Sequence, residues 1–262
     1  GTAERCLTEA ASALEGADFT SDLGSKDKAA ATFACTLLDA RWRTHYALGR
    51  SYEYQYVDDL RRTVQACPTL AAAASDQLAQ ISFDRAENVR QALQSANPPS
   101  RDVALGAVTD YRDALGVEAF RVPAYRGMGQ IFEALAASDP GDAVSYLTSA
   151  SEAYESLVGP SAQADDQELL GRSLLALAEQ TGRPGSDATQ KLYTRAASAY
   201  QAATGLAATP ERYRGLGEAL AATGQLDASI AAYRSAIAGL TGKARADASF
   251  ALAKVLDRSG DA

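Results

Sequence analysis

A short motif occurs twice in this chain and constrains its fold more than any other feature. Residues 125–129 read Tyr-Arg-Gly-Met-Gly, and residues 213–217 read Tyr-Arg-Gly-Leu-Gly. An alanine–tyrosine pair also recurs late in three alanine-rich stretches, at Tyr154, Tyr200 and Tyr233. Self-similarity of this kind is typical of repeat architectures, in which one supersecondary unit stacks on the next. We therefore expect repeated units along the chain.

The segment 210–243 shows the repeating unit most clearly. One face of a helix, with the spacing i, i+3, i+4 and i+7, is formed by Tyr213, Leu216, Gly217 and Leu220. Gly224 predicts the end of this helix, and Asp227 lies in the first turn of the next, where the helix dipole favours an anion. The apolar face of that second helix consists of Ile230, Tyr233, Ala236 and Ile237. Two helices and a tight turn repeat with a period of about 34 residues.

This unit resembles the tetratricopeptide repeat, a helix–turn–helix of the same length. The family pattern is an aromatic residue, then Leu-Gly, an aromatic residue or Leu, Gly, a small residue, an aromatic residue and Ala. In this chain the residues that match the pattern, in order, are Tyr213, Leu216, Gly217, Leu220, Gly224, Ser229, Tyr233 and Ala236. The resemblance implies an all-α fold, a right-handed superhelical solenoid of antiparallel helix pairs, with about twelve helices in this chain. It also implies that Gly217 and Ser229 lie where the two helices cross, because small side chains let the helix axes approach.

The resemblance is strong from about residue 120 onward, moderate over 100–117 and weak before that, and the repeat spacing is irregular. We predict an N-terminal helical hairpin over residues 1–40, packed on one continuous irregular array over residues 41–262. The sequence Asn-Pro-Pro-Ser at 97–100 predicts a firm helix break. The chain stops two residues after Gly260, where a second helix should begin, so either the array ends there or it continues in a longer chain.

The charge balance excludes some classes of partner. The chain has 33 acidic and 25 basic side chains, a formal net charge of −8 and a pI near 4.8. We expect no nucleic-acid partner, because binding to phosphates requires a positive field. No apolar run approaches the ~20 residues that cross a bilayer, so we expect no direct membrane insertion.

The sequence offers little for catalysis. His45 is the only histidine, and we interpret it as a packed or capping residue, because a catalytic triad or zinc site needs further bases or ligands. We interpret the acidic pairs Asp58-Asp59 and Asp165-Asp166 as solvated helix starts or faces. The sequence therefore predicts no enzyme activity, no cofactor and no metal site.

The three cysteines, Cys6, Cys35 and Cys67, fit no zinc-ligand spacing. They are either three small buried apolar residues or they include a disulfide. If the first two helices are antiparallel, Cys6 and Cys35 could face each other, which makes Cys6–Cys35 the candidate disulfide and leaves Cys67 free. This pair and the missing initiator Met slightly favour the periplasm or cell envelope over the cytoplasm.

In solenoids of helix pairs the first helices line the concave side, so the resemblance implies a binding groove on their exposed faces. The candidate partner-binding residues in this groove are Arg50, Glu53, Tyr54, Arg126, Gln130, Glu133, Glu168, Arg172, Arg214 and Glu218. Arg126 and Arg214 occupy equivalent places in two units, and arginine binds carboxylates in a bidentate way. We therefore hypothesise an extended or helical peptide of acidic character as the ligand. The alternative is that these are ordinary solvated charges paired with their own glutamates.

These features favour a non-catalytic scaffold that binds a protein or peptide partner through the groove. One alternative is a helical accessory or regulatory domain of a larger enzyme or cell-envelope assembly, and another is an apolar ligand pocket inside a tightly wound superhelix. Some family members bind chaperone C-termini through a clamp of Lys and Asn, but the asparagines of that clamp are missing here. The sequence leaves open whether the chain forms a homo-oligomer.

Overall fold

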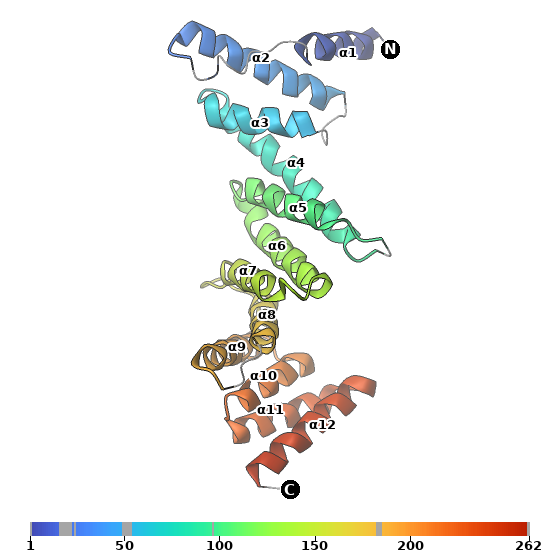
Figure 1. Cartoon of the computed structure of the whole chain (residues 1–262), viewed down its shortest axis with the longest axis vertical. Helices are drawn as coiled ribbons and strands as arrows, with labels where there is room; N and C mark the ends of the chain where they lie inside the picture. Colours follow the sequence, from blue (N-terminus) through green and yellow to red (C-terminus); the bar gives the residue numbers. More distant parts are fainter. Residues whose placement is uncertain are drawn as a thin grey trace. The chain divides into compact units, whose positions relative to one another are not determined.

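The computed structural model describes residues 2–15, 23, 25–48, 54–95, 97–181 and 185–260. The described residues form twelve α-helices and no strand (Figure 1), which confirms the expected all-α class and number of helices. Helices that are consecutive in the chain pack against one another. The helices are α1 (Thr2–Glu15), α2 (Lys28–Ala47), α3 (Tyr54–Ala66), α4 (Ala71–Ala92), α5 (Arg101–Ala114), α6 (Glu118–Ser138), α7 (Ala143–Glu155), α8 (Ala164–Gln180), α9 (Asp187–Leu206), α10 (Pro210–Ala222), α11 (Leu226–Gly239) and α12 (Gly242–Ser259).

The chain divides into two compact units, Gly1–Gly127 and Met128–Ala262, which we call the N-terminal and C-terminal units. The boundary between the units falls inside α6. The predicted hairpin over residues 1–40 and array over residues 41–262 stay a prediction, although residue 40 lies within α2, which continues to Ala47. Within the residues that the structure describes, no helix is both long enough and apolar enough to cross a bilayer.

Local sequence explains where several helices begin and end. The side chains of Ser100, Ser186 and Thr209 accept a hydrogen bond from a backbone N–H three residues later, at the starts of α5, α9 and α10. The helix break predicted at 97–100 is therefore confirmed just before α5. Gly224 follows the end of α10 with a φ of +77°, a left-handed conformation that favours glycine, as the sequence predicted.

The core of the N-terminal unit centres on two aromatic side chains from neighbouring helices. Trp42 of α2 and Tyr56 of α3 meet edge to face, with ring centroids 6.4 Å apart. Both rings are buried, and aliphatic residues of α3 and α4 pack around them, namely Val57, Leu60, Leu78 and Ile81. His45, in the last turn of α2, is buried as well, in agreement with its interpretation as a packed residue.

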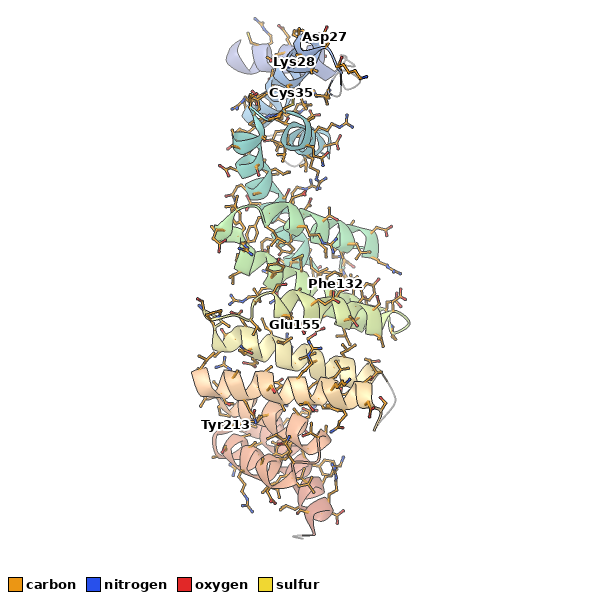
Figure 2. The ribbon with its side chains drawn as sticks, turned by 90° about the vertical axis from the view of Figure 1, so that its left-hand side faces the viewer. Asp27, Lys28, Cys35, Phe132, Glu155 and Tyr213 are labelled. Atoms are coloured by element: carbon orange, nitrogen blue, oxygen red, sulfur yellow. A yellow bond between two sulfur atoms is a disulfide. The ribbon has the colours of Figure 1, made fainter. Side chains whose placement is uncertain are left out.

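The disulfide in the N-terminal unit joins Cys35 to Cys67. The expected Cys6–Cys35 pairing is therefore wrong: Cys6 is a free, exposed cysteine on α1. Cys35 lies on α2 (Figure 2), and Cys67 follows the end of α3, which packs on α2. The packing of the first two helices does not decide the pairing, because Cys67, just after the end of the third helix, lies within bonding distance of Cys35. The bond ties α2 to the turn between α3 and α4.

The structure also corrects the interpretation of the acidic pair at 58–59 as a solvated helix start or face. Asp59 is buried, and the guanidinium of Arg41 donates two hydrogen bonds to it, including one from Nε to Oδ2 at 2.6 Å. Burial raises the pKa of the Asp59 carboxyl, and Arg41 opposes that rise. Asp58 conforms better to the expected solvated face, because it pairs with Arg62 one turn later at a partly exposed position. Asp59 thus contributes an ion pair within the packed interior.

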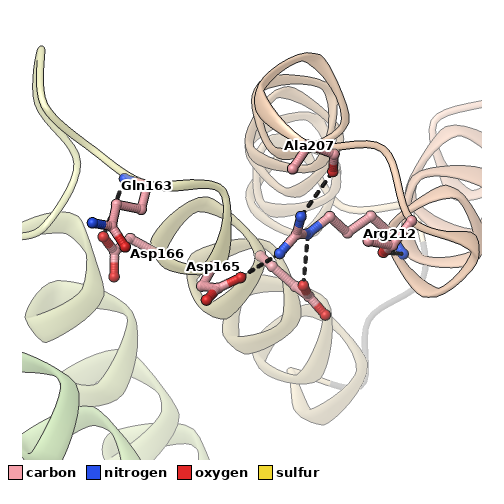
Figure 3. A network of polar contacts seen from close by, with 7 residues as sticks. Gln163, Asp165, Asp166, Ala207 and Arg212 are labelled. Atoms are coloured by element: carbon pink, nitrogen blue, oxygen red, sulfur yellow. Dashed lines mark hydrogen bonds and ion pairs between the residues drawn. The ribbon is translucent and has the colours of Figure 1, made fainter.

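In the C-terminal unit the pair at 165–166 likewise has structural partners (Figure 3). Asp166 is buried and accepts a hydrogen bond from the backbone N–H of Gln163, which closes the start of α8. Asp165 pairs with the buried guanidinium of Arg212, from the first turn of α10. Arg212 also donates to Glu168 Oε2 at 2.8 Å and to the carbonyl oxygen of Ala207 at 2.7 Å. One arginine therefore links α8, the end of α9 and α10.

Candidate functional site

In four places a buried tyrosine ring packs against a glycine of a neighbouring helix. A Cβ built on Gly129 would stand 2.3 Å from the ring of Tyr154, and one built on Gly217 would stand 3.0 Å from the ring of Tyr233. The same relation holds in the N-terminal unit between Gly127 and the ring of Tyr111. The fourth case is Tyr200, which touches two glycines, Gly171 of α8 and Gly215 of α10. The glycines of the repeated sequence motif thus make room for tyrosines.

The crossing of α10 and α11 follows the sequence expectation closely. The Ser229 hydroxyl, fully buried on α11, donates to the carbonyl oxygen of Gly217 on α10 at 2.7 Å. A larger residue at either position would hold the two backbones apart. The placement of Gly217 and Ser229 at the helix crossing is therefore confirmed.

The hydroxyls of these four tyrosines differ in whether they have a hydrogen-bond partner. Tyr154 Oη donates to Glu133 Oε2 at 3.2 Å, and Tyr111 Oη donates to Glu87. Among the described residues, Tyr200 and Tyr233 have no hydrogen-bond partner for their hydroxyls, although charged groups surround both. Burial raises the pKa of Tyr233 to about 12, and the Glu218 carboxylate adds to this rise.

Two of the predicted groove residues meet each other directly. Arg172 of α8 donates to both carboxylate oxygens of Glu133 on α6, at 2.8 and 3.4 Å. The Arg172 side chain is 53% exposed, so this ion pair borders solvent. Arg172 therefore has an internal carboxylate partner, as the alternative of ordinary paired charges predicted for it.

Two other predicted residues, Arg214 and Glu218, are exposed on α10 and belong to one pocket. The pocket has a volume of about 200 Å³ and is lined by Arg214, Glu218, Tyr233, Asp247, Ala248 and Ala251. We call it the Tyr233 pocket. Desolvation raises the pKa of Glu218 above its ordinary value of 4.5, and the nearby carboxylate of Glu179 on α8 raises it further, while Arg214 opposes both.

Helices α8 and α10 of the C-terminal unit both approach Tyr200 of α9. Its hydroxyl experiences the charges of Arg172 and Glu168 from α8 and of Arg214 and Glu218 from α10. Four of the residues singled out by the sequence therefore surround one tyrosine. Charged side chains of α8 and α10 therefore lie near one another around Tyr200.

The other candidate residues are placed less informatively. Arg50 and Glu53 lie outside the described residues, and Tyr54 is the first residue of α3 but its side chain also lies outside them. Arg126 is half-buried in the N-terminal unit, and Gln130 is half-buried in the C-terminal unit.

The sequence did not indicate two of the carboxylates near this surface, nor that two of the tyrosine hydroxyls have no hydrogen-bond partner among the described residues. Glu179 is in the last turn of α8 and Asp247 is in α12, and neither belongs to a recurring motif. Their proximity to Glu218 arises because α8 and α12 both pack on α10. The tyrosines themselves were visible as a recurring alanine–tyrosine pair, but which hydroxyls lack a partner depends on contacts between helices.

The chemistry available at this surface is ionic and hydrogen-bonding recognition. It offers carboxylates, guanidinium groups and two open phenol hydroxyls. In the described part of the chain, no group of three or more His, Cys, Asp or Glu side chains could hold a metal ion.

Comparison with known proteins adds no relative: no protein-family model matches this chain, and no curated protein matches it either.

Proposed function

We propose that this chain is a non-catalytic scaffold of tetratricopeptide-like helix pairs that binds a polypeptide partner. The proposed binding surface is the polar face of the C-terminal unit formed by Arg172, Arg214, Glu218 and their neighbours. In this proposal the helix pairs continue into a right-handed solenoid, and first helices such as α8 and α10 line its inner side.

The observation that carries the proposal is the position of Tyr200 between Gly171 and Gly215. Two first helices, α8 and α10, approach the same ring of a second helix, α9. The residues next to these glycines, Arg172 and Arg214, are both exposed. The packing that holds the repeat together therefore also sets charged side chains side by side toward solvent, which is the arrangement a groove needs to recognise a chain segment.

The described residues support this surface better than a catalytic reading. The solvent-facing groups are charged and hydroxyl-bearing, and the only histidine is buried in the N-terminal unit. Charged groups at the edge of a binding surface chiefly set partner choice and orientation. The expectation of an acidic ligand has weak support, because Arg172 is already engaged by Glu133.

A random peptide library displayed on phage and selected on the immobilised chain tests the proposal. Selected peptides are then titrated against the wild type and against the double variant Arg172→Ala with Arg214→Ala. We expect the affinity to change by about tenfold or more, downward for a peptide whose acidic residues meet the arginines and upward for one whose basic residues lie beside them, because the charge of the surface is altered.

The matched control removes two exposed arginines from the second helices α9 and α11, with Arg195→Ala and Arg234→Ala. It lowers the net charge equally but leaves the proposed surface intact, so affinity should be unchanged. Selection that yields no binder, or binders equally sensitive to both double variants, would contradict the proposal.

A further inference from the structure

The buried tyrosines give an internal comparison that singles out one pocket. All four occupy related positions, each packed on a glycine of a neighbouring helix. Tyr111 and Tyr154 satisfy their hydroxyls with a glutamate of the protein, whereas Tyr200 and Tyr233 do not within the described residues. Within the described part of the chain, neither of these two hydroxyls is among the buried polar atoms without a partner, so each can form a hydrogen bond with solvent or a ligand. The Tyr233 side chain is 4% exposed and lines the Tyr233 pocket, so its hydroxyl is available to an occupant of that pocket.

The charge around this pocket is unbalanced. Glu218 and Asp247 line it together with Arg214, and Glu179 lies near Glu218. Across the described residues, none of these four side chains has an opposite charge within ion-pair distance. Two carboxylates and one guanidinium therefore line the pocket, and a third carboxylate lies beside it. The C-terminal unit as a whole has the same sign, with 16 acidic and 11 basic side chains.

The side chains that line the pocket indicate which kind of cation fits it. Ala248 and Ala251 of α12 add apolar side chains to the lining of the pocket. Lysine and arginine bury their aliphatic stems on apolar surface while their charged ends remain with polar partners. A bare metal ion does not fit the side chains present, since the described carboxylates form no group close enough to hold one.

We propose that the Tyr233 pocket binds a lysine or arginine side chain of the partner polypeptide. The cationic end lies between Glu218 and Asp247 and donates a hydrogen bond to the Tyr233 hydroxyl, and the stem lies along Ala248 and Ala251. This assignment rests on the proposed function. It gives the ligand a positive charge, whereas the arginines suggested an acidic ligand, because the carboxylates outnumber the arginine here.

A peptide selected from the library serves as the probe, synthesised with its basic residues replaced one at a time by norleucine, which keeps the aliphatic stem and removes the charge. We expect one replacement to lower affinity by about tenfold, the loss typical of a charge-assisted hydrogen bond at a partly buried site. Glu218→Gln with Asp247→Asn should produce the same loss for the basic peptide and none for the norleucine peptide. Tyr233→Phe, which keeps the ring on Gly217, should weaken only the basic peptide.

The matched control is Glu211→Gln with Asp257→Asn, the same two chemical changes on exposed residues of α10 and α12 away from the pocket. It should leave both affinities unchanged. Thermal unfolding of each variant shows whether the fold is retained, and Tyr233→Phe provides an independent answer if the double variant unfolds.

Each remaining outcome distinguishes the two proposals. Peptides that bind without any basic residue, or acidic peptides whose binding depends on Arg214, would overturn the pocket assignment and leave the scaffold function standing. Basic peptides that are insensitive to the pocket variants would do the same. If the library yields no binder at all, the scaffold function fails and the pocket assignment fails with it.

Discussion

The ring of Tyr200 on α9 lies so close to Gly215 on α10 that a Cβ at residue 215 would stand 2.3 Å from the ring's Cζ atom. No real Cβ contact is that short, so a side chain at residue 215 would force the two helices apart. The same ring also lies close to Gly171 of α8, where an added Cβ would stand 2.8 Å from the ring. A single aromatic side chain thus fixes the spacing of three helices. This spacing also determines where the charged residues beside the glycines lie.

Replacing Gly215 by alanine should therefore destabilise the C-terminal unit. We expect a loss of about 1–3 kcal/mol in the free energy of unfolding, because overpacking a filled interior forces helices or rotamers to shift. Gly205→Ala is the matched control, since it lies in α9 with no atom within 4 Å of the added methyl group. There the higher helix propensity of alanine should leave stability unchanged or slightly raised. Urea unfolding measures both, and equal effects at the two sites would contradict the packing argument.

Replacing Arg212 by alanine removes a buried guanidinium that links α8, the end of α9 and α10. We expect a loss of about 1–3 kcal/mol, because the Ala207 carbonyl loses its donor and two carboxylates lose their partner. Arg195→Ala is the control: its ion pair with Glu155 is half-exposed and should contribute under about 1 kcal/mol. Denaturant titration of the two variants should separate them clearly, and a harmless Arg212→Ala would show that the network does not hold the helices together.

Breaking the disulfide should weaken the N-terminal unit. Replacing Cys35 and Cys67 by serine is expected to cost about 2–4 kcal/mol, because the bond restricts the unfolded chain between residues 32 positions apart. Hydrogen exchange should show the loss of protection concentrated in α2, α3 and α4. Cys6→Ser should have no effect on exchange, since Cys6 is exposed and free. A thiol reagent should label one cysteine in the folded protein, and labelling of Cys35 or Cys67 without reductant would contradict the pairing.

The pH dependence of stability should carry a signature of Glu218. Its pKa is raised in the folded protein by desolvation and by Glu179, so the folded state holds the proton more tightly than the unfolded state. By linkage, the stabilising contribution of the protonated form is present at low pH and is lost as the pH rises from about 4.5 through the higher folded-state pKa. Glu218→Gln should abolish this decline.

Urea unfolding at a series of pH values compares the wild type with Glu218→Gln and with Glu211→Gln. The wild type and Glu211→Gln should lose stability in parallel as the pH rises through this range, while Glu218→Gln should stay flatter. A Glu218→Gln profile that runs parallel to the wild type would show that Glu218 titrates as in the unfolded chain.

Several features of the fold could be predicted from sequence because they depend on neighbours in the chain. Helix starts at Ser100 and Thr209, the end at Gly224 and the crossing at Gly217 and Ser229 all follow from spacings of a few residues. The recurrence of the glycine motif and the alanine–tyrosine pair likewise indicated where helices pack. The disulfide could not be predicted in this way, since the partner of Cys35 is set by the packing of α3 on α2.

By itself, then, the sequence determined that the chain forms helices, where several of them begin or end and which faces of α10 and α11 pack, because helix formation and amphipathicity are read from residues three or four positions apart. Only the tertiary structure decided which charges meet. Arg212 pairs with carboxylates 44 and 47 residues away, and Glu218 approaches Glu179 from another helix. Such contacts depend on how far each helix is rotated and shifted against its neighbours, and that is settled by the packing of rings such as Tyr200 on glycine, through space and not along the chain.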